Sequence, residues 1–126
     1  LVTFKAHSKG EELIILLGRS HYVNGKFIAS NLCIILTPKN NPKYPINVQF
    51  YNIYLNAIRK RIVNELADGT SKLTISADDL MNYYVEYFHI DKQNEWVEYY
   101  NKTIVPLQNK LNKEKENFDN RVYNLV

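Results

Sequence analysis

The sequence predicts an α+β fold, with a twisted β-sheet, packed helices and a C-terminal helical arm. Short β-rich or continuously apolar runs occupy the chain before residue 37, whereas from Ile46 onward apolar residues recur every three or four positions. A second stripe of this kind runs from Trp96 to Leu125. Because 126 residues, 45% of them hydrophobic, suffice for one core, we expect an α+β domain over residues 1–90 and a helical arm over 91–126.

The first 45 residues predict strands joined by turns. Residues 1–6 and 13–17 are β-type runs, separated by a basic turn at 7–10. Within the hairpin region 18–25, Asn24-Gly25 predicts a tight turn, and Phe27-Ile28-Ala29 then leads into a buried strand over 32–36. Three prolines exclude a helix from the loop at 37–45.

The middle of the chain predicts one long helix and three shorter elements. The helix spans 46–67, ends at Asp68-Gly69-Thr70, and has one apolar face formed by Val48, Tyr51, Leu55, Ile58, Ile62 and Leu66. Leu73-Thr74-Ile75 is a short β-type segment. Ser76 is typical of a helix N-cap, so Asp78 and Asp79 in the following turn are interpreted as capping groups rather than catalytic carboxylates. The aromatic run 83–90 predicts a final core strand.

The last segment predicts one or two amphipathic helices that require a partner surface. Pro106 either kinks a single helix or opens a second one. The face Lys113–Glu116 is charged and is expected to be exposed. The arm resembles a coiled-coil-like element that packs on another chain or domain, along a stripe formed by Trp96, Tyr100, Ile104, Leu107, Leu111, Phe118, Val122 and Leu125.

Charge is distributed unevenly along the chain. Residues 1–63 hold nine Lys or Arg against two acids, a formal +7, whereas residues 64–126 hold seven basic and eleven acidic residues, a formal −4. A polyanion would therefore bind the first half. The alternative is an AT-rich genome that favours Lys, Asn, Tyr and Ile codons, but this does not account for the scarcity of acids in one half.

The sequence also suggests where the protein resides. A single cysteine, Cys33, cannot form an internal disulfide and no signal peptide opens the chain, so we expect a cytoplasmic protein. The longest apolar runs, 13–17 and 32–36, are too short to cross a membrane. Because the first residue is Leu1 rather than Met, we expect that the sequence was cut from a longer polypeptide.

No catalytic constellation is evident in the sequence. His7, His21 and His89 lack the short spacing of a zinc site, and Cys33, between Leu32 and Ile34, is interpreted as a core residue. The glycines match neither a phosphate loop nor a dinucleotide-binding pattern. We therefore expect neither a metal nor a cofactor on this chain.

Four clusters mix cationic, amide, hydroxyl and aromatic side chains, a combination that suits nucleic acid. Lysines neutralise phosphates, whereas Arg, His and Asn have the donors and acceptors that read base edges. The alternatives are that polar residues fill solvated loops, and that Arg19 stacks on Tyr22 or pairs with Glu11 or Glu12. The candidate DNA-binding residues are Lys5, His7, Lys9, Arg19, His21, Asn24, Lys26, Lys39, Asn41, Lys43 and Lys72.

The order of segments resembles a known family. The runs "GKFIASNLCIILTPK", "YNIYLNAIRKRI" and "LADGTSKLTISADDLMNYYVEYFHI" resemble the second half of a target recognition domain of DNA methyltransferases and of type I restriction-modification specificity subunits. The opening "LVTFKAHSKGE" looks like the strand that precedes these elements. The tail "IVPLQNKLNKEKENFDNRVYNLV" is similar to the final helices of N6-adenine methyltransferases and fused restriction-methylation enzymes.

The resemblance implies a target-recognition-type sheet and a non-catalytic role. The chain would recognise double-stranded DNA, while a methyltransferase domain or subunit, elsewhere, would transfer the methyl group from S-adenosylmethionine. It departs from the family at Glu86–Ile90, where a Pro-rich ending is usual, and it lacks the catalytic "NPPY"-type tetrapeptide, which Asn41-Pro42-Lys43-Tyr44 only echoes. The alternative is a protein-interaction or assembly domain that uses its C-terminal amphipathic helix.

Overall fold

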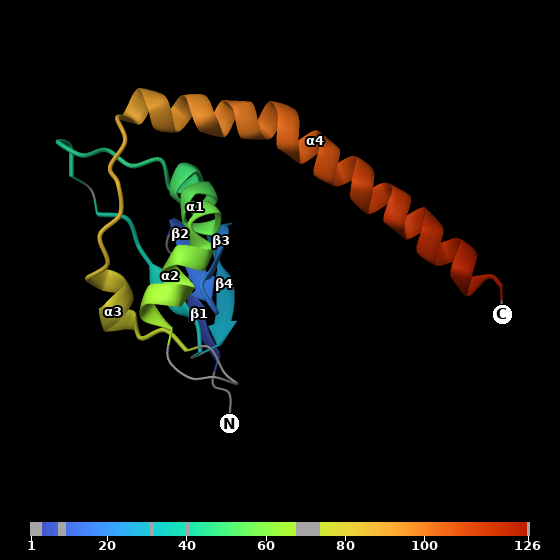
Figure 1. Cartoon of the computed structure of the whole chain (residues 1–126), viewed down its shortest axis with the longest axis horizontal. Helices are drawn as coiled ribbons and strands as arrows, with labels where there is room; N and C mark the ends of the chain where they lie inside the picture. The colour runs from blue at the N-terminus through green and yellow to red at the C-terminus, as the bar shows by residue number, and fades with distance from the viewer. Residues whose placement is uncertain (1–3, 8–9, 31, 40, 68–73, 126) are drawn as a thin grey trace.

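The computed structural model describes residues 4–7, 10–30, 32–39, 41–67 and 74–125. It shows an α+β protein in which strands fill the first third and helices follow (Figure 1). The strands are β1 (Phe4–His7), β2 (Glu11–Leu16), β3 (Arg19–Asn24), β4 (Phe27–Ser30) and β5 (Ile34–Leu36). The helices are α1 (Val48–Ala57), α2 (Arg59–Leu66), α3 (Ala77–Met81) and α4 (Ile90–Tyr123).

The strands form two antiparallel sheets. β1 pairs with β4, while β2 lies at the centre of a three-stranded sheet of order β3-β2-β5. The register sets Glu11 opposite Asn24 and Leu16 opposite Arg19, so the two ends of β3 lie at opposite ends of the sheet. Leu13 faces Leu36 of β5, which places the loop after β5 at the Glu11 end.

The β2–β3 hairpin turns at Leu17-Gly18, where both residues have positive φ (52° and 76°). Asn24-Gly25 does mark a turn, since Gly25 has φ 94° and its N–H donates to the Gly10 carbonyl. That turn leads from β3 into β4, in the other sheet. The stretch 19–24, expected as part of the hairpin turn region, is therefore strand β3.

The predicted apolar helical face is confirmed, but two helices share it. Val48, Leu55 and Ile62 are buried with Leu13 and Ile15 of β2, and the other predicted positions pack against this cluster. Ile58, at φ −97° and ψ 12°, separates α1 from α2. α1 begins at Val48 because the side-chain oxygen of Asn47 accepts hydrogen bonds from the Gln49 and Phe50 amides.

Of the three elements predicted next, the helix capped by Ser76 is confirmed and the strand over 83–90 is wrong. Ser76 caps α3 by accepting a hydrogen bond from the Asp79 amide at 3.1 Å, and Asp78 and Asp79 lie exposed in the first turn. Leu73 lies outside the described residues. Residues 83–89 form no strand: they run extended beside α1, and Phe88 packs edge-on against Phe50 and Tyr54.

The C-terminal segment is a single helix of 34 residues that passes through Pro106. Its first turns pack on α1. Gln93, which is completely buried, accepts a hydrogen bond from the Asn47 amide and donates to the carbonyls of Pro45 and Phe88. Beyond the body the helix changes direction near its middle and projects away as an arm (Figure 1). Pro106 lacks the N–H that would bond to the fourth residue before it, which accounts for a bend there.

None of the helices in the described part of the chain is long and apolar enough to span a membrane.

Candidate nucleic-acid interface

The turn that precedes Arg19 is fixed to α2. The guanidinium of Arg59 donates to the Leu17 carbonyl from both Nε, at 3.2 Å, and Nη2, at 2.9 Å. Gly18 is buried, and a Cβ there would lie 2.9 Å from Cγ2 of Val63. Only glycine fits this close approach at positive φ. The start of β3 is therefore held rigidly against the helix.

Asn56 of α1 fixes the next residue of the same strand. Its Oδ1 accepts a hydrogen bond from the Ser20 amide at 2.8 Å, and its Nδ2 donates to the Ser20 carbonyl at 2.9 Å. The side-chain amide thus takes the place of a neighbouring strand along the edge of β3. In the sequence, Asn56 lies within the run "YNIYLNAIRKRI", and nothing in the local pattern indicates that it contacts β3.

Arg19, His21 and Asn24 do not lie together on one surface that could contact base edges. All three side chains are exposed. Because side chains alternate along a strand, Arg19 and His21 lie on one face of β3 and Asn24 lies on the other. Arg19 and Asn24 are also separated by the length of β3, about 17 Å at the usual rise per residue.

The structural alternatives for Arg19 find no support in this arrangement. Glu11 lies opposite Asn24, at the far end of the sheet, and Glu12 is buried and accepts a hydrogen bond from the Thr37 hydroxyl at 2.6 Å. Tyr22 differs from Arg19 in parity and packs against the core, so the two side chains lie on opposite faces of β3. Arg19 therefore remains available to solvent.

A second group of candidates lies on the loop after β5. Lys39 and Lys43 are exposed, and the Lys43 ammonium lies 5.6 Å from the ring centroid of Tyr44. Asn41 has a structural role, since its Oδ1 accepts from the Lys43 amide at 3.0 Å and its carbonyl accepts from the Tyr44 amide. Lys26 follows β3 at the same end of the sheet as this loop.

The other candidates are described only in part. Lys5 and His7 belong to β1, where they pair in register with Ala29 and Phe27. Lys9 and Lys72 lie outside the described residues.

Exposed cations on the body of the protein are not neutralised by described carboxylates. In the described part of the chain, the ion pairs are Lys102–Glu98 and Lys115–Asp119 within α4, and His89–Asp91 at its start. The exposed cations of the described body that form no such pair are Arg19, Lys26, Lys39, Lys43, Lys60 and Arg61, of which Arg61 bonds to the Tyr83 hydroxyl.

Most described acids of the second half lie on α4. α4 holds six acidic and six basic residues, so it is formally neutral. Several of the other acids lie on α2, α3 and the extended segment 83–89. Glu65 on α2 accepts a hydrogen bond from the Tyr83 hydroxyl, which in turn accepts from Nε of Arg61 at 3.0 Å. Loss of hydration and the hydrogen bond to Glu65 raise the pKa of Tyr83, so it stays a neutral phenol at physiological pH.

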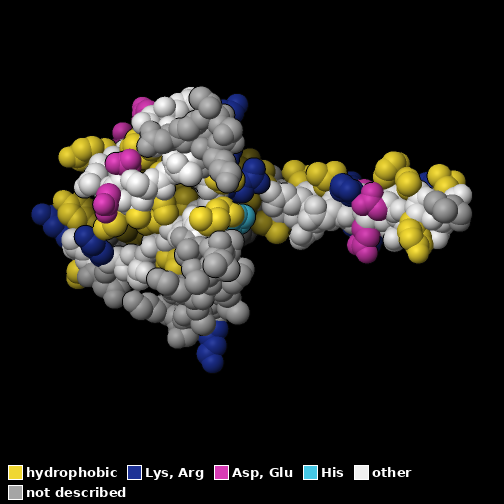
Figure 2. Space-filling view, turned by 90° about the horizontal axis from the view of Figure 1, so that it is seen from below, with side chains coloured by type: hydrophobic (Ala, Val, Ile, Leu, Met, Phe, Trp, Pro, Cys, Tyr) yellow, Lys and Arg dark blue, Asp and Glu magenta, His cyan; other side chains and the backbone are white. Residues whose placement is uncertain are grey.

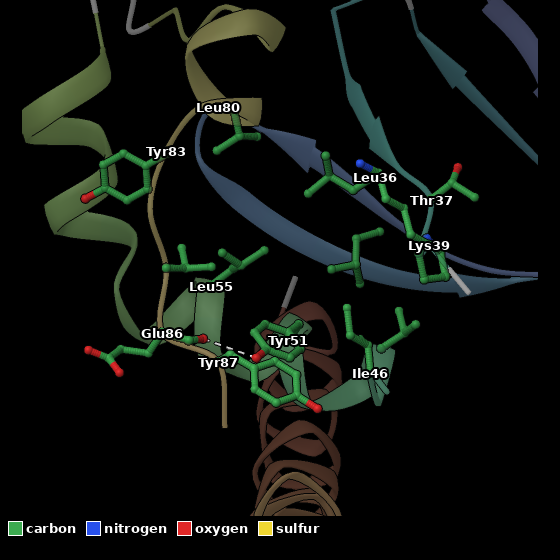
Figure 3. A pocket seen from close by; sticks show the side chains of 14 residues that line it. Leu36, Thr37, Lys39, Ile46, Tyr51, Leu55, Leu80, Tyr83, Glu86 and Tyr87 are labelled. Atoms are coloured by element: carbon green, nitrogen blue, oxygen red, sulfur yellow. Dashed lines mark hydrogen bonds between the residues drawn. The ribbon is translucent and has the colours of Figure 1, made fainter. Parts of the chain in front are cut away.

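An apolar pocket of about 370 Å³ lies beside this segment, between β5, α1 and residues 83–87 (Figure 3). Its walls include Leu36, Leu55 and Leu80. Tyr51 donates to the Glu86 carbonyl at 3.1 Å, and Tyr87 donates to the Pro45 carbonyl at 2.8 Å. The Glu86 carboxylate points away from the hollow (Figure 3). Such a pocket can accept an apolar group but offers no acid–base pair.

Metal chemistry also lacks a site in the part of the chain that the structure describes, where no group of three His, Cys, Asp or Glu could hold an ion.

Neither a protein family, nor a characterised protein, nor a solved structure matches this chain.

Proposed function

We propose that this chain is the non-catalytic, DNA-recognition part of a restriction-modification DNA methyltransferase. The observation that supports the proposal best is a set of exposed cations on the sheet, the loop after β5 and α2 that form no ion pair with a described carboxylate: Arg19, Lys26, Lys39, Lys43 and Lys60. Such cations break no ion pair within the protein when they meet phosphates, and their binding releases the counter-ions condensed on the DNA.

The division of roles follows residue chemistry. Lys39 and Lys43 are flexible point charges that suit phosphates. Arg19 lies at a strand start that Arg59 and Asn56 hold, and its guanidinium has the paired donors that suit bidentate recognition of a base edge. The proposal has two further parts. The sheet of this chain is of the target-recognition type, and a separate methyltransferase domain or subunit binds S-adenosylmethionine and flips the target base.

Binding of labelled duplex DNA at several ionic strengths tests the proposal. We expect affinity to fall steeply with salt, and Lys39→Ala to lower the slope of log affinity against log salt by about one unit, as for the loss of one phosphate contact. Lys110→Ala on the arm is the matched control and should leave the slope unchanged. Absence of binding at low salt would contradict a DNA-recognition role.

A second candidate function is assembly through the arm. It is favoured by the apolar side chains that protrude along the outer half of α4 (Figure 2), including Leu107, Leu111 and Phe118, which are 60%, 68% and 64% exposed. Apolar groups in such a row are typical of a surface that another helix covers.

A further inference from the structure

The helical face that anchors α4 on the body continues into the arm. Ile90, Val97, Ile104, Leu111, Phe118 and Leu125 are spaced seven residues apart, the repeat that keeps one helical face toward a partner helix. At the N-terminal end this face is covered by the body, where Gln93 and Val97 are buried. From Pro106 to Leu125 every residue is exposed. We call the apolar residues of the outer part the arm seam: Ile104, Leu107, Leu111, Phe118, Val122 and Leu125.

The arm seam has the same spacing when it is read from either end. About a midpoint between Glu114 and Lys115, Leu111 mirrors Phe118, Leu107 mirrors Val122, and Ile104 mirrors Leu125. At about 100° per residue, the seam residues from Ile104 to Val122 and the two central charged residues fall on one side of α4, which ends at Tyr123, two residues before Leu125. Glu114 and Lys115, an acid and a base that mirror each other, flank the apolar residues on either side, and Arg121 lies about 20° beyond Glu114.

We infer that two copies of this chain pair through their arms as antiparallel helices, with a two-fold axis between Glu114 and Lys115. Each apolar residue of the seam then meets an apolar residue of the second copy, Leu111 against Phe118 and Leu107 against Val122. Glu114 of each copy meets Lys115 of the other. A parallel pair in register would instead set Glu114 beside Glu114 and Lys115 beside Lys115, which like-charge repulsion opposes.

Nothing described within the chain competes with this arrangement. Lys115 pairs with Asp119 one turn later, but an exposed pair of this kind contributes little and can exchange for Glu114 of the second copy. The bend near Pro106 carries the arm clear of the body, so a second helix can lie along it (Figure 1).

Sedimentation equilibrium over a range of concentrations tests the pairing without DNA, so its outcome is independent of the DNA-recognition proposal. We expect a monomer–dimer equilibrium, weakened at least about tenfold by Phe118→Asp. Tyr123→Asp is the matched control: Tyr123 is 79% exposed, but it is turned about 100° from Val122, off the seam, and should leave the equilibrium unchanged. Circular dichroism checks that both variants keep their helix content.

Two further pairs of variants test the orientation of the two arms. Glu114→Lys and Lys115→Glu should each weaken the dimer, and mixing the two proteins should restore it, because each then meets the opposite charge. In a Cys33→Ser background, Leu111→Cys and Phe118→Cys proteins should form a disulfide when mixed, whereas Leu111→Cys alone should not.

Three results would overturn the inference. The first is a chain that stays monomeric at all concentrations, which would assign the arm seam to a helix of a different protein. The second is a dimer that Phe118→Asp does not weaken. The third is efficient cross-linking of Leu111→Cys to itself, which would indicate parallel helices.

Discussion

Asn56 performs a structural task on which the proposed DNA contact depends. Its amide satisfies both backbone groups of Ser20, a buried residue in an edge strand, so Asn56→Ala would leave a buried N–H and C=O without partners. We predict that this change lowers the free energy of unfolding by about 1–3 kcal/mol. Urea denaturation measures it, with Asn64→Ala on the exposed surface of α2 as the control, expected within about 0.5 kcal/mol of the original protein. If Asn56→Ala and Asn64→Ala lowered the free energy of unfolding equally, the hydrogen bonds from Asn56 to Ser20 would not stabilise the fold.

Gly18 imposes a second requirement at the residue scale. Gly18→Ala would combine positive φ with a Cβ 2.9 Å from Val63, and we expect a loss of about 1–3 kcal/mol of stability. Gly10→Ala is the control, because a Cβ at Gly10 has no neighbour within 4 Å. Thermal unfolding of the two variants compares them directly. A Gly18→Ala protein as stable as Gly10→Ala would mean that the turn is not held against α2.

At the scale of elements, Gln93 joins the segment before α1 to the start of α4. The buried side chain bonds to the Asn47 amide before α1, to the Pro45 carbonyl, and to Phe88 before α4. Gln93→Ala should therefore destabilise the protein by more than about 1 kcal/mol, since buried backbone groups lose their partners. Gln108→Ala, in the exposed arm of the same helix, should be near neutral. Hydrogen exchange should show faster exchange at the first turns of α4 in the Gln93 variant only.

Periodicity predicted some elements well because the information is local. The apolar face from Val48 to Leu66 is encoded at helical spacing, and the N-cap at Ser76 needs only its own side chain and the amide of Asp79. The break at Ile58 was not predicted, because the apolar spacing continues across it without interruption.

The strand predicted at 83–90 shows where local patterns fail. Aromatic and β-branched residues favour strands because they pack well on a sheet. Here the same side chains find other partners: Tyr83 bonds to Glu65, Tyr87 stacks edge-on with Tyr44, and Phe88 packs on Phe50. Propensity cannot distinguish these outcomes, because the partners come from elements tens of residues away.

The candidate site was predictable in its residue types but not in its geometry. The exposure of Arg19, Lys39 and Lys43 agrees with the expectation of solvent-facing cations. Their distribution over two ends of the sheet depends on strand register, and the hairpin turn at Leu17-Gly18 required a leucine with positive φ that no turn rule anticipates.

At the scale of the whole molecule, the body and the arm have different surfaces. Unpaired cations lie around the sheet, whereas α4 is formally neutral, forms its own ion pairs and has an apolar row along its outer half. These surfaces suit two tasks, DNA contact by the body and pairing by the arm. The central claim is that the body, not the arm, meets DNA.

Acetylation of lysines in the presence and absence of duplex DNA, read residue by residue by mass spectrometry, tests this claim most directly. The account predicts that DNA protects Lys26, Lys39 and Lys43 on the body and that addition of salt removes the protection. The arm lysines Lys110 and Lys113, equally exposed, should react at the same rate with and without DNA. Protection confined to the arm, or the same reactivity at all five lysines with and without DNA, would contradict it.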